Sequence, residues 1–189
     1  MQKIARKITS AIQHEKPELS DLQLRTIQFG LECLLGEVTK IIIYSIVFSL
    51  LSLTDQFITA MIFFTTIRLV AGGYHEDTYW RCFFTSLGLF TVIIGAGVYL
   101  PIGLDIKMIM FMMALVLMWV YAPVDHPNKP IISATRRRRF KYISVSITIL
   151  MGVIGFLLPE MYSGTAMTAI LIEAVSLPAG KYMNGRKCI

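Results

Sequence analysis

The chain has 189 residues, of which 55% are hydrophobic and 16% are charged. This composition excludes an ordinary soluble domain of the same length and indicates an integral membrane protein with one compact domain. The net charge of +6 lies beside apolar runs, so it indicates membrane topology and contact with acidic lipid rather than with nucleic acid. Three cysteines without a CxxC motif argue against a disulfide framework or a zinc site, and we expect neither a metal nor another cofactor.

Residues 1–37 are expected to form two amphipathic helices at the cytoplasmic surface of the membrane. Isoleucines recur at positions 4, 8 and 12, a spacing that places them on one face of a helix. Pro17 ends this helix, and Ser20 is a suitable N-cap for the next one. The alternative is that these helices pack on the rest of the protein instead of on lipid.

Six apolar segments follow within residues 38–180, which we expect to form a single transmembrane domain, with residues 181–189 as a cytoplasmic tail. The predicted fold is therefore all-α and polytopic, with six transmembrane helices. A spanning helix needs about 20 residues, and the first, second and sixth segments are marginal by this measure. The alternative is a four-span arrangement with the weaker segments partly at the interface. The segments are 41–54, 56–67, 83–100, 108–124, 142–159 and 161–177.

The positive charges sort to one side of such a domain. With six spans and both termini on one side, Lys107 is the only one of the 18 lysines and arginines on the other side. The positive-inside rule then makes the basic side cytoplasmic. We therefore predict a multi-pass protein of the cell membrane, with both termini, residues 72–81 and the basic loop 125–141 in the cytoplasm.

His75 and Cys82 form the candidate catalytic pair, within residues 68–82. A thiolate is a better nucleophile than a thiol, whose reference pKa is about 8.5, and a neighbouring imidazolium favours the thiolate. On one straight helix the two residues would lie about 10.5 Å apart along the axis, beyond hydrogen-bond reach. The backbone must therefore bend between them, and Gly72-Gly73 permit the angles of such a break. The alternative is a loop histidine and a cysteine that only fills space.

Arg68 and Glu173 are charges inside apolar segments, where a charge costs about 2.5–3.5 kcal/mol on insertion scales. Arg68 either extends to the lipid headgroups or faces inward to bind a carboxylate or a substrate carbonyl. Glu173 pairs either with Arg68 or with another arginine across the bundle. Asp77 and Glu76 are candidates to orient His75.

A proline-rich segment, 121–130, leads into the basic run Arg136–Arg139. Its three prolines stiffen the chain after the fourth apolar segment. Four consecutive arginines can bind phosphate, acidic lipid or an acidic peptide. The alternative is a topological signal before the fifth segment, which needs no ligand.

Taken in order along the chain, these motifs resemble the accessory gene regulator B (AgrB) family, the membrane cysteine endopeptidases of Gram-positive peptide quorum sensing. The length of the chain, its early amphipathic segment and its multi-span pattern agree with the family over nearly the whole sequence. The matching positions are Arg68, Gly72, Gly73, His75, Cys82, 121–123, 127–131 and Arg136–Arg139.

The resemblance implies that the chain removes the acidic C-terminal tail of an accessory gene regulator D (AgrD)-like precursor peptide. His75 would act as the base and Cys82 as the nucleophile that forms an acyl-enzyme thioester. An internal cysteine of the precursor would then close a thiolactone, and a serine would close a lactone. The expected supporting residues are Arg68, Gly72, Gly73 and Asp77.

The acidic tail of the precursor is expected to dock on the basic cluster. A homodimer is compatible with a small six-span bundle. The rival interpretations are a non-catalytic peptide transporter or export partner, with Arg68 and Glu173 along its pathway, and a membrane scaffold. The expected docking residues are Lys129, Arg136, Arg137, Arg138 and Arg139.

Overall fold

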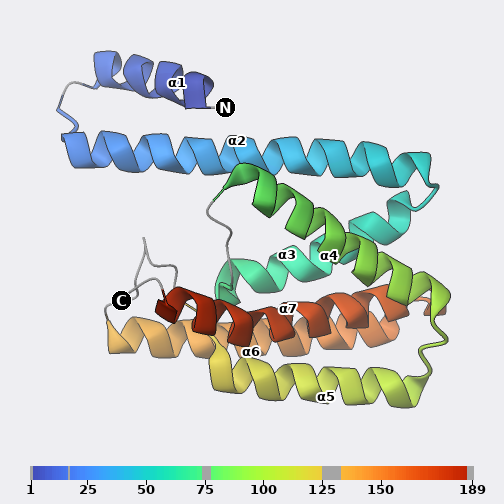
Figure 1. Cartoon of the computed structure of the whole chain (residues 1–189). Coiled ribbons are helices and arrows are strands. Elements are labelled where there is room, and N and C mark those ends of the chain that lie inside the picture. The colour runs from blue at the N-terminus through green and yellow to red at the C-terminus, as the bar shows by residue number, and fades with distance from the viewer. Residues whose placement is uncertain (1, 17, 74–77, 125–132, 187–189) are drawn as a thin grey trace. The chain divides into compact units, whose positions relative to one another are not determined.

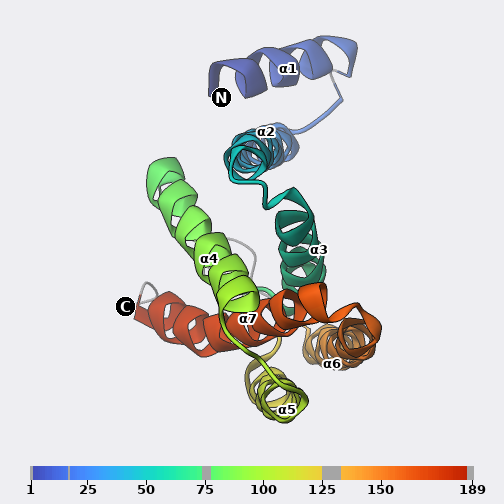
Figure 2. The same ribbon diagram turned by 90° about the vertical axis from the view of Figure 1, so that its right-hand side faces the viewer.

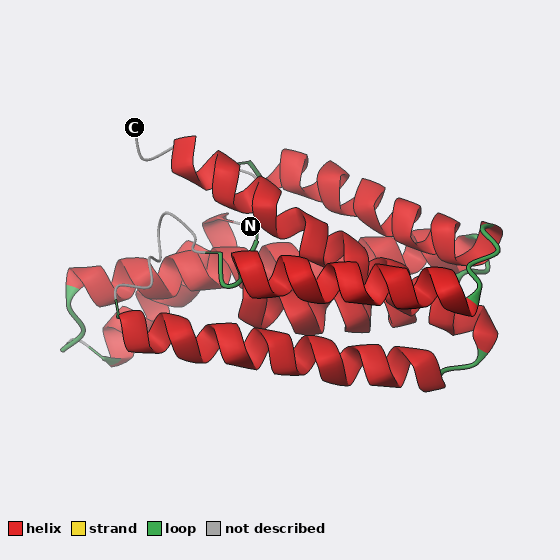
Figure 3. Ribbon diagram, turned by 90° about the horizontal axis from the view of Figure 1, so that it is seen from below, coloured by secondary structure: helices red, strands yellow, loops and turns green. Residues whose placement is uncertain are grey.

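The computed structural model of the chain describes residues 2–16, 18–73, 78–124 and 133–186. Every element in these residues is an α-helix (Figure 3), which confirms the prediction of an all-α fold. The chain divides into two compact units, Met1–Ser52 and Leu53–Ile189. The helices, labelled in Figure 1, are α1 (Gln2–Glu15), α2 (Asp21–Leu50), α3 (Thr54–Ala71), α4 (Tyr79–Tyr99), α5 (Leu104–Tyr121), α6 (Ala134–Leu157) and α7 (Glu160–Arg186).

The first unit consists of α1 and α2. A capping box starts α2: the Ser20 hydroxyl accepts a hydrogen bond from the Gln23 backbone, and the Gln23 side chain accepts one from the Ser20 backbone. The predicted N-cap at Ser20 is therefore confirmed. The expected boundary between residues 37 and 38 falls inside α2, because no proline interrupts the sequence between Asp21 and Leu50.

The second unit is built around α7, which contacts α3, α4, α5 and α6 (Figure 2). Residues 163–170 of α7 are all buried, and most of them are small. Gly97 lets α4 approach closely, because a Cβ atom at this position would lie 2.5 Å from the Cα of Thr165. Small residues on a central helix thus allow four helices to pack against it.

Four of the described helices, α2, α4, α5 and α6, are long and apolar enough to cross a membrane. These helices indicate an integral membrane protein. The helices α3 and α7, which carry Arg68 and Glu173, are not among the four.

Successive helices of the second unit alternate in direction (Figure 1), so the C-terminal ends of α3, α5 and α7 lie with the N-terminal ends of α4 and α6. We call this the motif end, because it carries most of the motifs found in the sequence. Lys181 of α7 and Lys141 of α6 both lie over aromatic rings near the end of α5, Tyr121 and Trp119. At the opposite end, the Gln56 side chain donates to the backbone oxygen of Met161 at 2.8 Å.

Candidate active site

The helical structure is interrupted before the candidate nucleophile, as predicted. The helix α3 ends at Ala71, and α4 begins only at Tyr79. Gly72 and Gly73 have φ angles of 76° and 139°, which side-chain-bearing residues rarely adopt. We call Gly72 and Gly73 the glycine turn. His75 and Asp77 follow it in sequence but lie outside the described residues.

Cys82 lies in the first turn of α4. Its backbone N–H donates to the oxygen of Thr78, the N-cap residue, at 3.0 Å. The side chain is a half-buried thiol. The structure therefore places the candidate nucleophile at the start of a helix.

The glycine turn packs against the segment that follows α5. The Val124 N–H donates to the Ala71 oxygen at 2.8 Å, and Gly72 forms a parallel bridge with Val124. A Cβ atom on Gly72 would collide with the Val124 oxygen. Two motifs that are 52 residues apart in sequence therefore meet at the motif end, and sequence reasoning missed the role of Val124.

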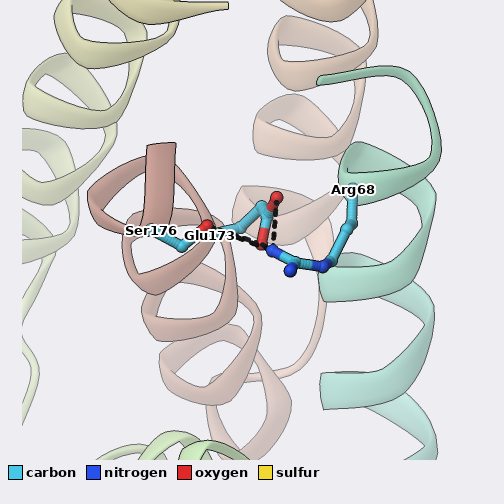
Figure 4. A network of polar contacts seen from close by, with 3 residues as sticks. All are labelled: Arg68, Glu173 and Ser176. Atoms are coloured by element: carbon cyan, nitrogen blue, oxygen red, sulfur yellow. Dashed lines mark hydrogen bonds and ion pairs between the residues drawn. The ribbon is translucent and has the colours of Figure 1, made fainter. Parts of the chain in front are cut away.

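Arg68, in the last turn of α3, forms an ion pair with Glu173 of α7 (Figure 4). Its Nη1 atom lies 3.1 Å from Glu173 Oε2 and donates to the Ser176 hydroxyl at 3.2 Å. The Ser176 hydroxyl in turn donates to Glu173 Oε2 at 3.2 Å. The Glu173 side chain is fully buried, and that of Arg68 is 20% exposed. Of the alternatives left open by the sequence, the structure selects the pair between Arg68 and Glu173.

Ser176 was not predicted as part of this network. It lies three residues after Glu173, so both side chains occupy one face of α7. That spacing is the signal that could have found it.

The glycine turn also contacts this network. A Cβ atom on Gly73 would collide with Arg68 Nη1 and would lie 3.2 Å from the Ser176 hydroxyl. The backbone at Gly73 therefore rests directly on the polar network, and only glycine leaves enough room for this approach.

The basic run lies at the start of α6, also at the motif end. Ser133 caps this helix by accepting a hydrogen bond from the Arg136 backbone at 3.4 Å. Arg136–Arg139 are all exposed, whereas Lys129 lies outside the described residues. Cations at a helix N-terminus oppose the helix dipole, so the run is electrostatically unfavourable without a nearby anion.

Metal-ligating side chains do not gather in the described part of the chain: no group of three or more His, Cys, Asp or Glu residues there could hold an ion. The functional groups described at the motif end are a thiol at a helix start, a buried ion pair and an exposed arginine run.

A helical bundle with apolar helices of spanning length and a thiol at one end defines an integral membrane protein with a candidate cysteine site. The sequence profile of the family described as Accessory gene regulator B matches residues 2–177, so the chain belongs to this family. The resemblance seen in the motifs is thus confirmed, and the accessory gene regulator role follows from membership.

Several relatives carry the name Accessory gene regulator protein B. The protein from Staphylococcus haemolyticus (strain JCSC1435) is 26% identical over 163 residues, which cover 86% of each chain. The protein from Staphylococcus aureus (strain Newman) is 26% identical over 165 residues, again 86% of each chain. The protein from strain MW2 of that species is 23% identical over 164 residues, covering 86% of this chain and 87% of the relative. No solved structure gives a significant match.

Proposed function

We propose that this protein is a membrane cysteine endopeptidase that removes the C-terminal tail of an AgrD-like quorum-sensing precursor. The observation that carries the proposal is the position of Cys82 in the first turn of α4, directly after the break that contains His75 in the sequence. Family membership supports the same reaction. No cofactor is required.

In the proposed mechanism, His75 takes the proton of the Cys82 thiol, and the thiolate attacks the scissile carbonyl carbon. The C–N bond breaks, His75 protonates the leaving amine, and the signal segment remains on Cys82 as a thioester. A cysteine thiol within the precursor then attacks this thioester, releases Cys82 and closes a thiolactone; a serine hydroxyl closes a lactone. Exchange of one thioester for another is nearly isoenergetic, so the step needs no nucleotide.

The negative charge that develops on the scissile carbonyl oxygen needs donors. The first N–H groups of a helix have no partner within that helix. Those of Tyr79 and Trp80, in the turn that carries Cys82, are the proposed oxyanion donors, and the backbone at Gly72-Gly73 is the other candidate. Asp77 is the proposed residue that orients His75.

Charge at the two ends of the second unit supports an orientation with the motif end in the cytoplasm. At the opposite end the described basic residue is Lys107, and it pairs with Glu160 at 2.6 Å. The positive-inside rule then makes the motif end cytoplasmic. The described basic residues of the motif end are Arg68, Arg81, Arg136–Arg139, Lys141 and Lys181.

The proposed topology has six spans, which adds α3 and α7 to the four apolar helices. Pairing of Arg68 with Glu173 lowers the cost of placing α3 and α7 in the bilayer, because the two charges offset each other inside the bundle. Residues 1–37 would then lie at the cytoplasmic surface, 38–180 would form the transmembrane domain and 181–189 the cytoplasmic tail. A homodimer stays a prediction.

The acidic tail of the precursor is proposed to dock on Lys129 and Arg136–Arg139. Exposure of the four arginines and their position against the dipole of α6 support this role, because a bound carboxylate would relieve the repulsion. In the rival interpretation as a peptide transporter, Arg68 and Glu173 would line the pathway and would have to exchange their mutual ion pair for contacts with the substrate.

The experiment uses the full chain in lipid vesicles and a synthetic precursor peptide, with release of the tail measured over time. The native chain should release the tail, and both Cys82→Ala and His75→Ala should not. Release at the native rate by both variants would refute the peptidase assignment and leave the transporter or scaffold interpretation.

A further inference from the structure

We propose that Glu173 and Ser176 of α7 are positioning residues for the peptidase reaction. They hold the Arg68 guanidinium against Gly73 and so fix the glycine turn from which the chain continues to His75. This inference rests on the proposed function, because it concerns the placement of the proposed base relative to Cys82.

The first support is the geometry of the polar network in Figure 4. Glu173 and Ser176 approach the same nitrogen, Arg68 Nη1, at 3.1 and 3.2 Å, and they also bind each other at 3.2 Å. Three mutually bonded groups fix this nitrogen more closely than one ion pair would. Because the carboxylate is fully buried, water competes less for its hydrogen bonds than it would at the surface.

The second observation is the packing of Gly73 against Arg68 Nη1. The backbone of Gly73 lies so close that a Cβ atom would collide with Arg68 Nη1. The same Cβ atom would lie 3.2 Å from the Ser176 hydroxyl. Any movement of the guanidinium therefore removes the surface on which the turn is packed.

The third observation is that the other side of the glycine turn packs against Val124. The Val124 N–H donates to the Ala71 oxygen at 2.8 Å, and the Val124 oxygen leaves no room for a Cβ atom on Gly72. The turn is thus held between Val124 and the network. His75 follows Gly73 by two residues, and each residue moves the chain by at most about 3.8 Å. A displaced turn therefore moves the point from which the chain continues to the base.

The network is not the only link between α3 and α7, so its role can be separated from helix packing. At the opposite end of the same two helices, the buried Thr165 hydroxyl donates to the Gln56 side chain at 2.5 Å. Thr165→Val removes this buried hydrogen bond far from the motif end. It is a matched control for the loss of a polar contact between α3 and α7.

The test compares Glu173→Gln, Ser176→Ala and Thr165→Val in the full chain in lipid vesicles, with Cys33 and Cys188 replaced by serine. Two quantities are measured: kcat and KM for tail release, and the pH dependence of Cys82 alkylation by iodoacetamide. Alkylation reports on the surroundings of the thiol and needs no cleavage.

Glu173→Gln should lower kcat about 100-fold, the effect of misplacing a catalytic group by about 1 Å. Its KM should stay near the native value, and its alkylation profile should move toward that of His75→Ala. Ser176→Ala keeps the ion pair and should show the same changes to a smaller extent, so it carries the test if Glu173→Gln does not fold. Thr165→Val should match the native chain in both measurements.

Two results would overturn the inference: native kcat and native alkylation in Glu173→Gln and Ser176→Ala, or equal losses in Thr165→Val. If the native chain releases no tail while Glu173→Gln still shifts the alkylation profile, the positioning role stands and the proposed function fails. If the native chain releases the tail and the variants behave normally, the positioning role alone fails.

Discussion

Gly73→Ala probes the closest contact at the motif end. The added methyl group would collide with Arg68 Nη1, and the φ angle of 139° is unfavourable for alanine. Overpacking of this kind costs about 1–3 kcal/mol, and a strained backbone conformation costs about 1–3 kcal/mol more. A shift of the turn would relieve both the steric collision and the backbone strain, but it would also change the position of His75.

A shift of about 1 Å lowers the rate about 100-fold, which corresponds to about 2.7 kcal/mol of transition-state stabilisation. We therefore expect Gly73→Ala to lower kcat for tail release by about this factor in lipid vesicles, as followed by mass spectrometry of the released tail. Thermal unfolding of the same samples shows how much of the loss reflects instability.

Gly88→Ala is the matched control, because Gly88 lies in α4, as Cys82 does, and a Cβ atom there meets nothing within 4 Å. This variant should retain the native rate, and alanine should favour the helix by about 1 kcal/mol relative to glycine. A native rate for Gly73→Ala, or an equal loss for Gly88→Ala, would refute the reasoning about the turn.

Three further predictions concern other parts of the second unit. Replacing Arg136 and Arg137 with glutamate should raise KM and alter the salt dependence of tail release. Unchanged kinetics would indicate that the basic run is a topological signal and does not bind the precursor. Glu160→Gln should lower the free energy of unfolding by more than the roughly 1 kcal/mol of an exposed ion pair, because the Lys107 side chain is only 3% exposed and loses its carboxylate. Tail release should stay unchanged, and slower release at a temperature where the variant is folded would contradict this separation. A membrane-impermeant thiol reagent should not label Cys82 from outside intact cells. Labelling from outside would show that the motif end faces the exterior, which would contradict the proposed topology.

Features set by local sequence were predictable. Ser20 caps α2 through neighbours within three residues, and the glycine turn ends α3 through its own backbone angles. The all-α fold follows from the same kind of signal. Each of these depends on residues a few positions apart, which a sequence displays directly.

Features that depend on distant contacts were not predictable. The Gly72–Val124 bridge joins segments 52 residues apart in sequence, and nothing in either segment specifies the other as its partner. The pairing of Arg68 with Glu173 was one of several options, since each charge only required some partner inside the bundle. The boundary expected between residues 37 and 38 concerns placement at the membrane and stays a prediction, although α2 runs through it.

The central claim is that Cys82 forms a covalent bond with the signal segment of its substrate. Mass spectrometry of the intact protein, after rapid acid quenching of a reaction with precursor, measures this bond directly. We predict that the native chain gains the mass of the precursor without its tail, as an adduct that hydroxylamine removes, and that Cys82→Ala gains nothing. Tail release with no adduct on the native chain, or with the same adduct on Cys82→Ala, would contradict the account.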